Sequence, residues 1–117
     1  MGYECKAYVV DVNHVGSLSW ASVVATFDLC AIGYEHLNSY LDLFKKDVDY
    51  DLYLNYEKVT EDCYGKPLKS AKVGDIVAWL EEVMKEDNYR RFRPYLGLLK
   101  GFDSSEWENL EVIHFGY

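Results

Sequence analysis

The sequence predicts an α+β fold in which a four-stranded mixed or antiparallel sheet carries two or three helices, mainly on one face. Three observations lead to this class. Runs of β-branched and aromatic residues indicate strands at 5–12, 20–32 and 110–117. Polar and apolar residues alternate at 49–59, as in a half-buried strand. Elsewhere, apolar residues three and four positions apart indicate helices. The expected order of elements is β-β-α-β-α-α-β.

The first two strands differ in their expected burial. Residues 5–12 follow no helical stripe and therefore indicate a strand. Residues 20–32 are almost wholly apolar, which predicts a strand that is buried on both faces. The same run is also compatible with a buried helix, because periodicity does not separate the two for an apolar run.

Three stretches have features of helices. Residues 73–86 carry a continuous apolar stripe with Asp75 in the first turn, which predicts the clearest helix. Residues 89–100 predict another helix, which Pro94 starts, kinks or divides and Gly101 ends. A helix is also expected from residue 35, with an inner face formed by Leu37, Tyr40, Leu41, Phe44 and Val48.

A strand and a loop are expected between these helices. Residues 60–72 predict a loop with a tight bend at Gly65. The alternation at 49–59 predicts one strand with a buried side and a polar, acidic side. The buried side would carry Tyr50, Leu52, Leu54 and Tyr56, and the polar side Asp51, Tyr53, Asn55 and Glu57.

A single domain is expected over residues 1–117. Half of the residues are apolar and 27% are charged, which is ordinary for a globular protein. No stretch approaches the roughly 18 apolar residues of a membrane span, and the N-terminus lacks a signal-peptide pattern. We therefore expect a cytoplasmic protein that does not contact a membrane.

The formal net charge is −8, and the first half of the chain carries most of it. Residues 1–63 contain eleven acids and four bases (−7), whereas residues 64–117 contain nine acids and eight bases (−1). Such a field repels phosphate backbones and anionic membranes and attracts basic proteins. The acidity therefore favours a basic protein partner over direct binding of nucleic acid, although it also fits a role in solubility alone.

The acidic residues between positions 47 and 62 form the first candidate site. Regularly spaced carboxylates on a rigid surface can imitate a phosphate backbone and occupy the basic groove of a nucleic-acid-binding protein. Neighbouring tyrosines favour a protein interface. Other interpretations of the row Asp47, Asp49 and Asp51 are a cation site, an acid–base pair and a solvated strand edge. The predicted partner-binding residues are Asp47, Asp49, Asp51, Tyr53, Glu57, Glu61 and Asp62.

The arginine segment Arg90, Arg91 and Arg93 is a secondary candidate. Arginines with interleaved aromatic residues bind phosphates or stack on bases. In an acidic protein, they also pair with carboxylates of the same chain. Together with the loop at 59–72, this segment would be the place for a small-ligand or enzyme site.

Motifs of catalysis, metal binding and cofactor binding are missing from the sequence. It has no Gly-rich phosphate loop, no Gly-x-Ser-x-Gly elbow and no His-Glu-x-x-His helix. The cysteines and histidines lack ligand spacing, so no metal or cofactor is expected, and a Cys30–His114 nucleophilic pair would depend on the fold. We expect a non-enzymatic protein-binding module. The alternatives are a self-associating structural or accessory protein, and a small-ligand binder or enzyme.

Three stretches carry a resemblance to known proteins, at 25–30, 59–68 and 98–103. Through them the chain resembles small proteins of unknown function from phages and prophages. The resemblance implies a phage role, such as inhibition of a host defence protein, including anti-CRISPR activity, or an accessory function. It implies no functional residue.

Overall fold

The computed structural model describes residues 3–12, 20–32, 34–86 and 92–117, and it confirms the α+β class. The strands are β1 (Tyr3–Asp11), β2 (Trp20–Ile32), β3 (Lys46–Asp47), β4 (Asp51–Leu54), β5 (Glu57–Val59), β6 (Lys69–Lys72) and β7 (Leu110–Gly116). The helices are α1 (Tyr34–Leu41), α2 (Val73–Glu86), α3 (Phe92–Lys100) and the short 3₁₀-helix η1 (Ser104–Asn109).

The sheet is mixed and has the strand order β3-β6-β7-β1-β2-β4-β5. The five strands from β3 to β2 are antiparallel neighbours. The β4–β5 hairpin joins this sheet through a short parallel pairing, in which Trp20 lies opposite Asp51 and Ala21 opposite Leu52. β3 and β6 were not indicated by the sequence, so the sheet has more strands than the four expected.

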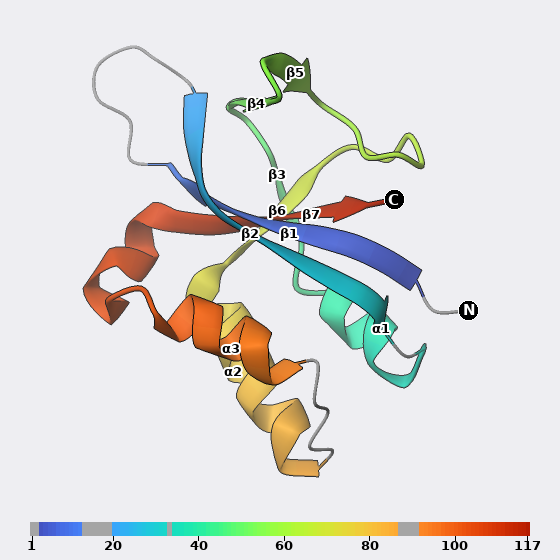
Figure 1. Cartoon of the computed structure of the whole chain (residues 1–117), viewed down its shortest axis with the longest axis vertical. Helices are drawn as coiled ribbons and strands as arrows, with labels where there is room; N and C mark the ends of the chain where they lie inside the picture. The colour runs from blue at the N-terminus through green and yellow to red at the C-terminus, as the bar shows by residue number, and fades with distance from the viewer. Residues whose placement is uncertain (1–2, 13–19, 33, 87–91) are drawn as a thin grey trace.

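Two apolar clusters cover the two faces of the sheet. Figure 1 shows the helices on one side of the sheet and the β4–β5 hairpin on the other. Alternate residues of β1 face each layer, because successive side chains of a strand point to opposite faces. Ala7 and Val9 pack in the cluster that holds the helices, whereas Val10 packs with Leu52 and Leu68 on the hairpin side.

The helix layer contains a cluster of aromatic side chains that contact one another. The hydroxyls of Tyr40 in α1 and Tyr95 in α3 are hydrogen-bonded at 3.0 Å. The Tyr95 ring also stacks on Phe27 of β2, with centroids 4.9 Å apart. The predicted helix at 73–86 is confirmed as α2, and its residues Ile76 and Leu80 are fully buried in the same layer. These contacts fix α1 and α3 on the sheet.

Two predicted details are wrong. The prediction that 20–32 is buried on both faces fails, because Val24, Thr26 and Asp28 are exposed. Thr26 and Asp28 lie on the same face of the sheet as the hairpin, but the hairpin reaches β2 only at Trp20 and Ala21. The helix from residue 35 does not reach Val48. It ends at Leu41, where the amide of Phe44 bonds to the Leu41 carbonyl at 3.1 Å and tightens the chain into a turn.

The stretch at 49–59 is a hairpin and not one strand. β4 and β5 pair antiparallel, with Tyr53 opposite Lys58 and Leu54 opposite Glu57. The loop that follows contains the predicted bend at Gly65, whose φ is +74°, but it ends in the unpredicted strand β6. Within the described residues, no helix is long and apolar enough to cross a membrane.

Candidate functional site

The turn of the β4–β5 hairpin presents an exposed tyrosine. Its two central residues, Asn55 and Tyr56, have φ values of 52° and 65°. Positive φ at both positions is the backbone of a type I′ turn, which matches the twist of paired strands. Asparagine adopts this conformation readily, but a bulky side chain rarely does. The Tyr56 side chain is fully exposed, at 103% of its reference area.

The two sides of the hairpin differ. Leu52 is buried, and Leu54 and Val59 pack beside it against the sheet. Tyr53 points away and is 52% exposed. The negative charge of the hairpin is partly neutralised, because the Asp51 carboxylate lies 3.0 Å from the Lys58 ammonium. The hairpin therefore offers two exposed tyrosines and carboxylates from a base that is packed on the sheet.

The predicted acidic row on one strand is wrong. Asp47 lies in β3, at one end of the strand order, whereas Asp51 lies in β4, near the other end. Asp49 lies in the connection between them. Asp47 forms an ion pair with Lys69 of β6, so β3 stays on its own edge of the sheet. The alternation of Asp47, Asp49 and Asp51 in the sequence thus does not bring them onto one side of one strand.

The remaining predicted residues fall into two groups. Tyr53 and Glu57 lie with Asp51 on the hairpin. Glu61 and Asp62 lie in the loop before β6, where one Asp62 carboxylate oxygen accepts hydrogen bonds from the amides of Tyr64 at 2.9 Å and Lys66 at 3.0 Å. Asp62 therefore shapes its loop, and the hairpin group remains the better interface candidate.

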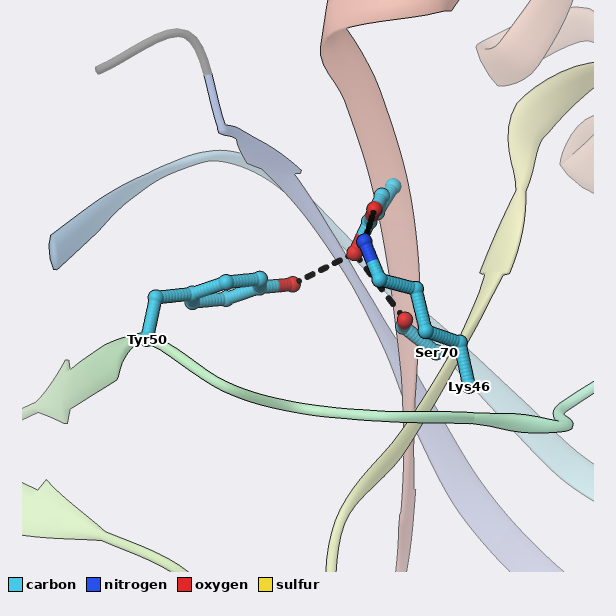
Figure 2. A network of polar contacts seen from close by, with 4 residues as sticks. Lys46, Tyr50 and Ser70 are labelled. Carbon is cyan, nitrogen blue, oxygen red and sulfur yellow. Dashed lines mark hydrogen bonds and ion pairs between the residues drawn. The ribbon is translucent and has the colours of Figure 1, made fainter. Parts of the chain in front are cut away.

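A buried carboxylate, that of Glu111, holds the segment that leads into the hairpin on the sheet. Glu111 of β7 is 7% exposed. It accepts hydrogen bonds from Lys46 at 2.6 Å, Tyr50 at 2.9 Å and Ser70 at 2.9 Å. Figure 2 shows Lys46 and Tyr50 reaching this carboxylate from one segment and Ser70 reaching it from another. The network ties the 46–50 connection, which leads into the hairpin, to β6 and β7.

The electrostatics of this network favour the charged form of Glu111. Burial raises the pKa of the Glu111 carboxyl, but hydrogen bonds from Lys46, Ser70 and Tyr50 and the charge of Lys46 outweigh it, so that the pKa lies below its ordinary value. The hydrogen bond to Glu111 raises the pKa of Lys46. Burial and the Glu111 charge raise the pKa of Tyr50. The Lys46–Glu111 pair is therefore ionised at neutral pH, with Tyr50 as a neutral donor.

Two small cavities open beside these elements. One, of about 170 Å³, is lined by Glu111, Ser70 and three lysines. The other, of about 180 Å³, is lined by His114, Phe44, Asp62 and two lysines. Burial lowers the pKa of His114 to about 4, against the opposing effect of Asp62, so the imidazole is neutral at pH 7. Among the described residues, neither cavity has an arginine in its lining, whereas the small-ligand alternative expects one there.

Only part of the arginine segment lies within the described residues. Arg90 and Arg91 lie outside the described residues, and Arg93 is exposed in the first turn of α3. α3 belongs to the helix layer, on the opposite side of the sheet from the hairpin. The described partners of Asp47 and Asp51 are Lys69 and Lys58. The acidic surface is thus balanced in part by lysines of its own strands.

Sequence reasoning missed Tyr56 and Glu111. Tyr56 was expected on the buried side of a strand, although the preceding asparagine, a common turn residue, is the signal that indicates a turn. Glu111 interrupts the apolar run of β7, which marks it as a buried charge, but nothing in the sequence indicates its three partners. Among the described residues, no three His, Cys, Asp or Glu side chains are grouped to hold a metal ion.

Comparisons with known proteins give no further assignment. No protein family, curated protein or solved structure matches this chain.

Proposed function

We propose that this protein is a non-enzymatic binding module that attaches to a basic protein through the β4–β5 hairpin. The observation that carries the proposal is Tyr56, a fully exposed aromatic residue at a turn position with a φ of 65°. Glycine would occupy this position with less strain. Folding therefore gives no reason for the tyrosine, whereas a binding surface does, since locally unfavourable residues occur at functional sites.

The chemistry of the hairpin supports a protein partner. Tyr53 and Tyr56 provide exposed area that is apolar on its ring faces and polar at its hydroxyl. Tyrosine is enriched in interfaces for this reason, and it loses little side-chain entropy on binding. The Glu111 network and the buried Leu52 hold the base of the hairpin, so that little ordering is needed when a partner docks.

The charge of the hairpin supports a basic partner. Residues 49–61 contain four acids and one lysine, a net charge of −3. Carboxylates around a tyrosine tip attract a basic surface and accelerate association. A groove that normally holds a phosphate backbone is basic and therefore complementary to the hairpin, so a nucleic-acid-binding protein is the partner class that fits best.

The resemblance to phage and prophage proteins directs the first search for a partner. A phage-encoded inhibitor would meet its target in the host cytoplasm. We propose host nucleic-acid-binding proteins, including defence nucleases of the CRISPR type, as the first candidates.

The experiment is affinity capture from host lysate at low and high salt with three forms of the protein. The first is the native chain, and the second carries Asp49→Asn, Asp51→Asn and Glu57→Gln. The third is a control with the same change of charge on the helix side: Glu81→Gln, Glu82→Gln and Glu106→Gln.

A nucleic-acid-binding protein that the native chain and the control retain at low salt, and that the hairpin variant loses, is the expected result. Equal capture by all three forms, or capture that salt does not weaken, contradicts the proposal.

A further inference from the structure

The strand β2 has a long open edge. β1 pairs with β2 from Tyr3 opposite Ile32 to Asp11 opposite Ser22. The register shifts between Tyr3 and Cys5 and between Val9 and Val10, which leaves residues 25–29 of β2 in regular register. On its other edge, β4 reaches only Trp20 and Ala21. Among the described residues, no strand pairs with this edge from residue 22 to residue 32. In a strand with one partner, the backbone N–H and C=O groups that point away from that partner can bond to another strand.

The regular part of this edge lacks the features that usually prevent pairing with another strand. Proteins guard edges with lysine, proline, bulges or very short strands, and the register shifts of β2 lie outside residues 25–29. β2 spans 13 residues and contains one charged residue, Asp28, with no lysine and no proline. By contrast, the strands at the ends of the order, β3 and β5, have two and three residues. The exposed Val23 and Val24 add apolar surface beside the open edge of β2.

We infer that a second copy of this chain pairs with this edge, β2 against β2, and joins the two sheets into one. The regular stretch of this edge, residues 25–29, is centred on Phe27. A two-fold axis at Phe27 therefore pairs this stretch with itself, so that Ala25 lies opposite Leu29 of the second copy. This antiparallel arrangement uses the same surface on both chains, as a two-fold interface requires.

The single charge of the strand fits this register. With the axis at Phe27, Asp28 lies opposite Thr26 of the second copy, where a hydroxyl faces a carboxylate. A shift of the axis to residue 28 would place the two Asp28 carboxylates opposite each other, which is unfavourable. A basic peptide would find only this one acid on β2 for recognition. The nearly uncharged edge thus suits a copy of itself better than the partner proposed for the hairpin.

The test is sedimentation of the native chain over a wide range of concentrations, beside two substitutions at the exposed Thr26. Thr26→Asp places two like-charge pairs across the axis and is expected to weaken the dimer roughly tenfold. Thr26→Lys places a lysine opposite Asp28 and is expected to retain or tighten it. Thr60→Asp, an exposed change of the same charge away from β2, is the control and is expected to leave the dimer unchanged.

The unfolding midpoint of each variant checks that it is folded. A native chain that stays monomeric at the highest concentration overturns the inference. So does a dimer that Thr26→Asp and Thr60→Asp affect equally.

Discussion

At the scale of single residues, Glu111 connects the sheet to the hairpin. Its carboxylate receives hydrogen bonds from Lys46, Tyr50 and Ser70, and its side chain is almost completely buried. A buried carboxylate is unfavourable unless charge and donors surround it. Lys46, Tyr50 and Ser70 surround the Glu111 carboxylate in this way, so these hydrogen bonds depend on the ionised form of Glu111.

The substitution Glu111→Gln is expected to lower the free energy of unfolding at pH 7 by about 2 kcal/mol, because charged hydrogen bonds to buried donors are lost. The folded pKa of Glu111 lies below its ordinary value of 4.5. Its stabilising effect is therefore complete above pH 4.5 and is lost as the pH falls through the folded pKa.

Urea unfolding of both proteins at several pH values measures this difference. The gap between native protein and variant should shrink on acidification. Glu108→Gln, on the exposed η1 helix, is the control and should change stability by less than about 0.5 kcal/mol. If the difference in free energy of unfolding between the native protein and Glu111→Gln is constant with pH, Glu111 stabilises the fold through its packing and not through its charge.

At the scale of elements, the β4–β5 turn combines strain and exposure at Tyr56. The change Tyr56→Gly is expected to raise the free energy of unfolding by up to about 1 kcal/mol, because glycine adopts positive φ without steric cost. The same change should weaken capture of the partner. Thermal unfolding and capture by the same protein sample measure the two effects.

Tyr56→Ala is the matched control, since it removes the ring but keeps a Cβ atom. It should weaken capture without the gain in stability. If Tyr56→Gly captures the partner as well as the native chain, the tyrosine is not part of the interface.

The sequence predicts those elements whose pattern is local and misses those that depend on distant pairing. The apolar stripe of α2 is sufficient to predict its bounds, because one helical face packs on the sheet. The alternation at 49–59 continues in the sequence across the turn at Asn55 and Tyr56, so periodicity alone indicates one long strand. β3 and β6 are short, and each exists because of a partner strand far along the chain. The partners of Glu111 cannot be predicted for the same reason, since two segments far from β7 in the sequence supply them: 46–50 and β6.

At the scale of the whole molecule, the two proposed surfaces differ in their electrostatics. The hairpin is acidic and would meet a basic partner, so attraction between opposite charges would contribute to its binding. The β2 edge would meet a second chain of the same net charge, −8. Its contacts would be backbone hydrogen bonds and apolar side chains, and they would form against repulsion between two acidic proteins.

Salt should therefore act on the two surfaces in opposite directions. The screening length falls from about 10 Å at 0.1 M salt to about 3 Å at 1 M. Capture through the hairpin should weaken over this range, because screening removes the attraction. The dissociation constant of the β2 dimer, measured by sedimentation, should fall, because screening removes the repulsion. A dimer that weakens with salt would be held by opposite charges, and β2, with Asp28 as its one charged residue, would not be its interface.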